Sequence, residues 1–327
     1  MPRLPRFVPP GKPMVITMRC FQSRFLLRPS DRVNALIKGV IARAQRLYGM
    51  TIYDVVVMSN HVHLYLCPRD HEQLEAFQRF VGSNLSKEIG AEISWEGGIF
   101  RGRYSSVPVT DEEKAQVERL TYLLAHGVKE GLVPRPQDWP GVSGVKQLMN
   151  GNMRIRGGKW IDRSGLYRAR RTWEANQRSK RRRVRHKEPR KIDYTHSLDI
   201  VLSPIPCWQG FTREQFRKSI EALLESIQEK YAHLIAQVPE DWKKRILRRD
   251  PHPRPEKTKR SRRPLCHAAS RQARFGFWEQ YHAWISSYMQ ASERLRSGIR
   301  EAIDEFPAGC HLPRLNAEVR KALEAPS

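Results

Sequence analysis

The sequence predicts an α+β fold for its first half, an antiparallel sheet with packed helices, followed by a basic arm and a mostly helical C-terminal extension. Two observations support this prediction. Short, strongly apolar runs alternate with longer segments whose apolar residues recur at helical spacing. The polar pair Ser59-Asn60 also joins two apolar runs directly, which indicates a tight turn between neighbouring antiparallel strands.

Each element of the first half follows from its own pattern. In chain order we expect a strand over 13–20, a helix over 30–48, a strand over 51–58, a strand that begins at His61, a helix over 71–89, a strand over 103–109 and a helix that ends near His126. Thr110 or Asp111 is the expected cap of the last helix, whose first turn is acidic. The order β-α-β-β-α-β-α matches a ferredoxin-like sandwich with one added helix.

Charge is the strongest feature of the composition. The 327 residues include 59 Lys and Arg against 34 Asp and Glu, a formal net charge of +25. Residues 1–150 account for 20 basic and 14 acidic residues, or +6, so +19 falls on residues 151–327. An enzyme of small neutral metabolites does not need such an excess. The charge therefore predicts a polyanionic partner, most often nucleic acid.

The cysteines and the apolar runs bear on the cellular compartment. Five scattered cysteines without a Cys-X-X-Cys pair indicate neither a disulfide framework nor a zinc ribbon. No stretch approaches the length of a membrane-spanning helix, and the first residues lack the apolar core of a secretion signal. We expect a cytoplasmic, nucleoid-associated protein with no membrane partner.

Composition divides the chain into three predicted parts: a catalytic domain over 1–150, a basic arm or linker over 151–195 and a helical extension of unknown role over 196–327. Residues 154–191 hold 16 Lys and Arg against 3 acidic residues, too little apolar material for a core. Arg181, Arg182 and Arg183 are its candidate phosphate contacts, and a solvated linker is the alternative. In the extension, helices are expected over 212–235 and 270–295, separated by a Pro/Arg/Lys-rich stretch over 245–264.

His61 and His63 are the first candidates for chemistry. Because side chains of a strand alternate between its two faces, both imidazoles leave the same face of an otherwise apolar strand. Paired imidazoles at this spacing suit a divalent metal ion. Two histidines on a solvated strand face, each paired with a neighbour, are the alternative.

Tyr122 and His126 form a second pair, four residues apart and hence on one face of the expected helix. Without further information this tyrosine is better explained as a packing or surface residue. The helix leads into Gly131-Leu132-Val133 and then Asp138-Trp139-Pro140.

Three motifs together resemble a known family. Residues 58–64, Met-Ser-Asn-His-Val-His-Leu, resemble the signature of the HUH single-tyrosine transposases. The run from Tyr122 to Pro140 is similar to the segment around the tyrosine in the REP-associated tyrosine transposases, of the insertion-sequence-200-like group, and residues 100–104 resemble the Arg-Tyr stretch between the two. The resemblance covers roughly residues 12–145 and implies the ferredoxin-like domain.

The resemblance also implies an activity. In that family a tyrosine attacks a phosphodiester of single-stranded DNA, commonly at a hairpin, and leaves a 5′-phosphotyrosine and a free 3′-hydroxyl. Carried over by position, Tyr122 is the nucleophile, and His61 and His63 bind the metal ion, Mg²⁺ or Mn²⁺. Arg101, Arg103 and Tyr104 are the candidate DNA contacts near the cut. The Tyr122 helix serves either its own subunit or that of a neighbour, which leaves a homodimer open.

The sequence departs from the family pattern at two places. Ser59 replaces a proline, which affects only the rigidity of the turn. Ala125-His126-Gly127 replaces an Asn-Asn-Pro-like stretch. We therefore expect His126 to be a third metal ligand, the alternative being a histidine that interacts with the helix dipole.

Three functions follow from these observations. The preferred prediction is a DNA strand transferase that acts through Tyr122 with a divalent metal ion. The first alternative is a domesticated, non-catalytic protein that binds structured DNA or RNA. The second is a metal-dependent hydrolase that forms no covalent intermediate and does not need Tyr122.

Overall fold

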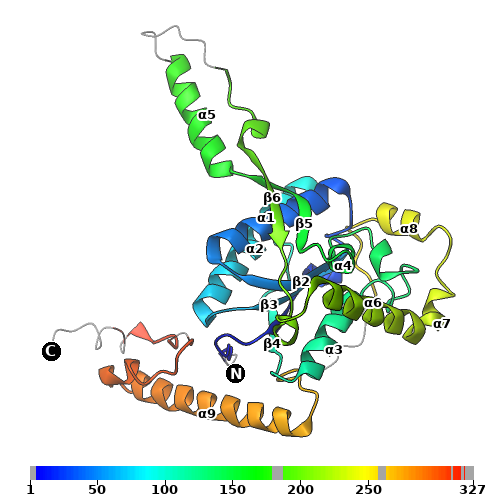
Figure 1. Ribbon diagram of the computed structural model, residues 1–327. Coiled ribbons are helices and arrows are strands. Elements are labelled where there is room, and N and C mark those ends of the chain that lie inside the picture. The colour runs from blue at the N-terminus through cyan, green and yellow to red at the C-terminus, as the bar shows by residue number, and fades with distance from the viewer. Residues whose placement is uncertain (1–4, 179–186, 257–262, 311, 318–319, 321–327) are drawn as a thin grey trace.

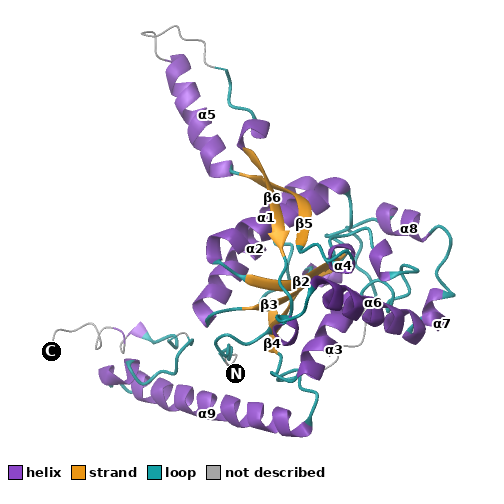
Figure 2. Ribbon diagram, in the orientation of Figure 1, coloured by secondary structure: helices purple, strands orange, loops and turns teal. Residues whose placement is uncertain are grey.

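The computed structural model describes residues 5–178, 187–256, 263–310, 312–317 and 320. Its centre is a four-stranded sheet of β1 (Met14–Arg19), β2 (Thr51–Met58), β3 (His61–Cys67) and β4 (Ser105–Pro108) in the order β2-β3-β1-β4. All neighbouring strands are antiparallel (Figure 1, Figure 2). With α1 (Asp31–Tyr48) and α2 (His71–Glu92) as the connections, this topology confirms the predicted α+β, ferredoxin-like sheet.

The helices of this domain begin where short polar side chains cap them. Ser30 Oγ accepts a hydrogen bond from the backbone N–H of Val33 at the start of α1, and Asp70 caps α2 in the same way. The cap predicted for the next helix was wrong. In α3 (Glu113–Leu124) Glu112 holds the N-cap position without a capping hydrogen bond, and the helix ends two residues before His126.

The two faces of the sheet are covered by different elements. The Tyr65 hydroxyl donates to the carbonyl oxygen of Gln116, so α3 lies on the face to which His61 and His63 also belong. α2 covers the opposite face, where a Cβ on its Gly82 would meet Met18 of β1 at 3.5 Å. The candidate histidines therefore lie between the sheet and α3.

Residues predicted as a basic arm are in part regular structure. β5 (Arg154–Ile161) and β6 (Thr195–Val201) pair antiparallel, and α5 (Arg163–Arg178), which lies between them in the chain, projects away from the body of the protein (Figure 1). Ile155 and Ile161 are buried in the main hydrophobic core. Composition did not predict these strands, because a few apolar residues among many charged ones are enough for two strands to pack on a helix.

Glycine makes the contact between this hairpin and α1 possible. A Cβ on Gly39 of α1 would stand 2.1 Å from the carbonyl oxygen of Lys159, so only glycine allows this approach. Gln45 of α1 also makes two hydrogen bonds with the backbone of Val201, at 2.6 and 2.9 Å. The hairpin is thus fixed to the first half of the chain.

α4 (Val145–Met149) ends the first part of the chain. The C-terminal half adds α6 (Arg213–Lys230), α7 (Ala232–Ile235), α8 (Trp242–Arg248) and α9 (Arg271–Arg296). Thr212 and Gln215 form a capping box at the start of α6. Phe216, Ile220 and Ile227 of this helix belong to the same core as the sheet. α8 lies partly inside the stretch expected to separate two helices, whereas α9 matches its prediction within one residue (Figure 2).

Among the described residues, every helix is too short or too polar to cross a lipid bilayer.

Candidate metal centre and active site

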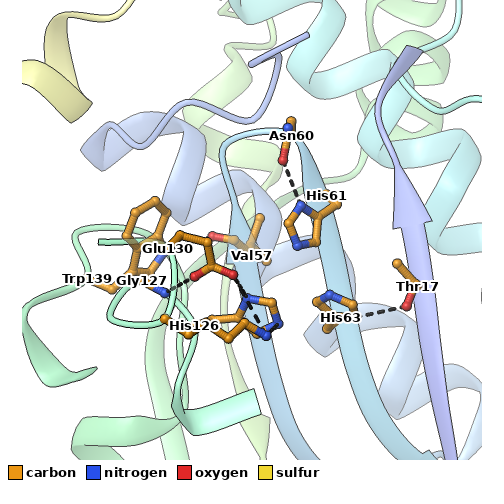
Figure 3. A network of polar contacts seen from close by, with 10 residues as sticks. Thr17, Val57, Asn60, His61, His63, His126, Gly127, Glu130 and Trp139 are labelled. Atoms are coloured by element: carbon orange, nitrogen blue, oxygen red, sulfur yellow. Dashed lines mark hydrogen bonds and ion pairs between the residues drawn. The ribbon is translucent and has the colours of Figure 1, made fainter. Parts of the chain in front are cut away.

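Strand pairing places the two histidines of β3. Thr17 of β1 lies opposite His63, and Arg19 lies opposite His61. The Ser59-Asn60 turn immediately precedes His61, so both imidazoles leave the sheet near its end and on one face (Figure 3). His63 is 4% exposed, and His61 is half-buried.

Neighbouring polar groups orient both rings. His61 Nδ1 donates to Asn60 Oδ1 at 2.7 Å, which leaves the Nε2 lone pair free to bind a metal ion. His63 Nδ1 lies 2.9 Å from the Thr17 hydroxyl, which accepts the hydrogen bond when Nδ1 carries the proton (Figure 3). Metal-binding histidines commonly have such a partner for the second ring nitrogen.

His126 completes the group from the turn that follows α3. Its ring centroid lies 5.5 Å from that of His61 and 4.6 Å from that of His63. Each of the three histidines offers a nitrogen within 4.8 Å of the others, so the cluster could hold a metal ion. Gly127 has φ +91°, and a Cβ there would lie 2.9 Å from a methyl group of Val133. Glycine is therefore required for the turn that presents His126.

Glu130 and Lys129 hold the ring of His126 from both sides. His126 Nδ1 donates to Glu130 Oε1 at 3.1 Å, while Glu130 Oε2 accepts from the backbone N–H of Gly127 at 2.7 Å (Figure 3). On the other side, Lys129 Nζ donates to His126 Nε2 at 3.1 Å. Burial alone raises the pKa of Glu130, but the hydrogen bond from His126 and the nearby ammonium of Lys129 hold that pKa below its usual value.

All three imidazoles are neutral near pH 7. Burial, together with the neighbouring His126, lowers the pKa of His61 to about 3, and burial also lowers the pKa of His63 and of His126. A neutral imidazole is the form that binds a metal ion. A histidine that stabilises a helix dipole must be charged, so the lowered pKa of His126 argues against that alternative.

Tyr122 lies beside these rings in the same chain. Its ring centroid is 5.8 Å from that of His63 and 5.0 Å from that of His126. The side chain is 39% exposed, so a macromolecular substrate can reach it. Burial of the remainder, with the nearby Glu130 carboxylate, raises the pKa of the phenol, which is therefore protonated at pH 7.

The candidate DNA contacts fall into three groups. Arg101 and Arg103 are exposed, and the backbone N–H of Arg101 donates to the carbonyl oxygen of Arg19 at 2.8 Å, next to the strand position opposite His61. The guanidinium of Arg6 lies 3.5 Å from the ring centroid of Tyr104, so one face of this ring is already covered. Arg181, Arg182 and Arg183 lie outside the described residues.

Sequence reasoning missed three residues that contact the site: Thr17, Lys129 and Glu130. Thr17 is brought to the site only by the pairing of β1 with β3, and the sequence alone does not reveal this pairing. Lys129 and Glu130 follow His126 by three and four residues, a spacing that brings side chains together in a helical turn. Both residues could therefore have been identified from the sequence by their spacing from His126.

No protein-family model and no curated protein matches this sequence. Among solved structures, a REP-associated tyrosine transposase bound to a REP hairpin is similar at 17% identity, with a TM-score of 0.38 over 46% of this chain and 86% of that one. A protein of Deinococcus radiodurans, provisionally described as a transposase, is similar at 15% identity, with a TM-score of 0.27 over 36% of this chain and 93% of that one.

Proposed function

We propose that this chain is a metal-dependent DNA strand transferase of the HUH class, which cuts single-stranded DNA beside a hairpin and holds one end on Tyr122. The observation that supports it is the meeting of three neutral imidazoles and one accessible phenol within a single chain. The excess of basic residues, at +25, agrees with a polyanionic substrate.

The donor set fits a divalent metal ion. His61, His63 and His126 would hold it, with Asn60, Thr17 and Glu130 orienting the rings from behind. Three imidazoles bind Mn²⁺ more tightly than Mg²⁺, which prefers oxygen ligands. When bound, the ion supplies charge neutralisation at the scissile phosphate and fixes its orientation.

Tyr122 contributes the covalent step. Its phenolic oxygen forms a bond to phosphorus while the bond from phosphorus to the 3′-oxygen breaks. The phenol loses its proton and the leaving 3′-oxygen gains one, so the products are a 5′-phosphotyrosine and a free 3′-hydroxyl. Because burial raises the pKa of Tyr122, the phenolate needs stabilisation. The ammonium of Lys129, 3.2 Å from the ring centroid, provides it through the ring face.

The test is a search for the covalent adduct. The protein is incubated with Mn²⁺ or Mg²⁺ and end-labelled hairpin DNA, and we expect a DNA adduct that survives denaturation. Tyr122→Phe removes the adduct and leaves hairpin binding intact, and His61→Ala removes metal-dependent cleavage. Tyr167→Phe, at an exposed tyrosine of α5, is the matched control and keeps the adduct.

Two outcomes would contradict this proposal and assign a different function. Cleavage that survives Tyr122→Phe would make the protein a metal-dependent hydrolase. Hairpin binding without any cleavage in either metal ion would make it a non-catalytic descendant that only recognises structured DNA or RNA.

A further inference from the structure

A cavity of about 460 Å³ opens directly beside the metal centre, within the size range of ligand sites. Its inner wall includes Asn60, His61 and Glu130, three residues already placed at the site. Another part of the lining comes from the C-terminal half of the chain, from Pro239, Trp242, Arg245, Ile246 and Arg249. α8 and the residues that flank it therefore build one wall of a cavity that also contains residues of the candidate active site.

The α8 wall is anchored from several sides. Ile246 is 8% exposed and packs into the main core. Arg28 donates to the carbonyl oxygen of Arg249 at 3.2 Å, and His252 lies 3.2 Å from the carbonyl oxygen of Ile93 at the end of α2. The cavity is thus a built junction between two parts of the chain.

The lining combines aromatic rings with guanidinium groups. Trp242 and Phe25 are half-buried, and Trp139 is fixed by a hydrogen bond from its indole N–H to the carbonyl oxygen of Val57. The guanidinium of Arg249 lies 4.0 Å from the centroid of the Phe25 ring. Rings offer stacking surfaces to a flat aromatic ligand, and arginine binds phosphate while it stacks.

The charge of the cavity favours an anionic occupant. Arg19, Arg245 and Arg249 line it, and Glu130 is the single carboxylate in the lining. Arg245 is paired with Asp241 at 2.6 Å. Arg19 and Arg249 therefore contribute most of the positive charge. Both oxygens of Glu130 already accept hydrogen bonds, from His126 and from the backbone of Gly127. A flat aromatic group that carries a phosphate matches the rings and the guanidinium groups together.

We propose that this cavity holds the unpaired base of a nucleotide next to the cleaved phosphodiester, stacked on Trp242, with a phosphate of the same strand at Arg249. The inference rests on the proposed function and adds a base-binding site to it. It also gives α8, outside the ferredoxin-like domain, a role in holding the strand that enters the active site.

The test measures binding to two probes in a Tyr122→Phe background with Mn²⁺. One probe is a DNA hairpin with a single-stranded oligothymidine extension, prepared in two versions with the extension at the 5′ or at the 3′ end. The other probe is the same hairpin with a blunt end. Base stacking on an aromatic side chain is sequence-tolerant, so oligothymidine is a suitable extension. We expect Trp242→Ala to weaken binding of the extended probe at least about fivefold and to leave the blunt probe unchanged.

Matched variants separate a base contact from a general loss of structure. Trp242→Phe keeps a stacking ring and restores the preference for the extended probe. Trp278→Ala, at an exposed tryptophan of α9, changes binding of neither probe. Arg249→Gln weakens binding of the extended probe, whereas Arg248→Gln, next to it but outside the cavity lining, does not. An abasic site in place of the stacked nucleotide weakens binding of the extended probe by the protein that keeps Trp242. The same abasic site causes no further loss of affinity in Trp242→Ala.

Equal affinity of the parent and Trp242→Ala proteins for the extended probe would overturn the inference, as would a parent that does not prefer this probe. Neither result touches the covalent adduct on Tyr122, which is measured separately in the otherwise unchanged protein. Loss of the adduct with a retained preference for the extension would instead overturn the proposed function and leave the base site standing.

Discussion

The ammonium of Lys129 lies 3.1 Å from Nε2 of His126, the ring nitrogen that this histidine would offer to a metal ion. The same ammonium lies 3.2 Å from the centroid of the Tyr122 ring. Lys129 thus connects the third candidate ligand with the candidate nucleophile. Burial lowers its pKa to about 8, so most of these side chains are still charged at pH 7.

Removal of this ammonium should strengthen metal binding. Lys129→Met keeps the length of the side chain and removes both the hydrogen bond to His126 and a positive charge next to the ion. We expect Mn²⁺ to bind about tenfold more tightly or better, a gain of about 1.4 kcal/mol. Titration calorimetry of the metal-free proteins measures it, with Lys114→Met, at an exposed lysine of α3, as the control. Equal or weaker Mn²⁺ binding by Lys129→Met would show that the ammonium does not compete with the ion.

The hydroxyl of Thr17 should affect metal binding at the candidate site although it is not one of the candidate ligands. Thr17→Val keeps the shape of the side chain and removes the partner of His63 Nδ1. Losing such a partner typically weakens metal binding about 10–100-fold, and we expect a loss in that range for Mn²⁺. Thr17→Ser keeps the hydroxyl and should bind Mn²⁺ like the parent protein. If Thr17→Val binds Mn²⁺ as tightly as Thr17→Ser, this hydrogen bond does not orient His63.

The sheet and the histidine pair could be predicted because both depend on local periodicity. Alternation along 61–63 is enough to place two imidazoles on one face, and Ser59-Asn60 is enough to mark the turn. The contact between Thr17 and His63 depends on which strands pair and in what register. That information is spread over the whole sheet, so Thr17 could not be singled out from its sequence neighbours.

The basic half of the chain was harder to predict for a different reason. Its charge pattern describes the solvated faces of β5 and α8, whereas a few residues decide the packing, such as Ile155 and Ile246. The close approach of Gly39 to Lys159 joins residues 120 positions apart. Composition averages over such residues, and it therefore predicted a basic arm or linker over 151–195 and a stretch between two helices over 245–264.

A buried carboxyl in the sheet should make stability depend on pH. Asp54 is fully buried where the pairing of β2 with β3 shifts register, and burial raises its pKa from 3.8 to about 7. Between these values the folded protein holds a proton that the unfolded chain releases, so this group makes stability fall as pH rises. Above about pH 7 the loss of folding stability from this group is complete. It is on the order of 4 kcal/mol, at 1.36 kcal/mol per pKa unit.

Asp54→Asn should remove this dependence. Urea unfolding at about pH 5 and about pH 8 compares the variant with the parent protein, and we expect the variant to gain stability relative to the parent as pH rises. Glu225→Gln removes an exposed carboxylate of α6 and should follow the parent at both values. A constant difference between Asp54→Asn and the parent would show that the carboxyl does not titrate in this range.

The contact between α1 and the β5–β6 hairpin should fail when one methyl group is added. In Gly39→Ala the new Cβ meets the carbonyl oxygen of Lys159, a backbone atom that cannot turn aside. We expect a loss of about 1–3 kcal/mol in stability and faster hydrogen exchange in Arg154–Ile161 and Thr195–Val201. Gly82→Ala is the matched control, because its Cβ makes only an ordinary 3.5 Å contact with Met18, and helix propensity should make this change neutral or stabilising. Unchanged exchange in both strands of Gly39→Ala would mean that the hairpin does not depend on this approach.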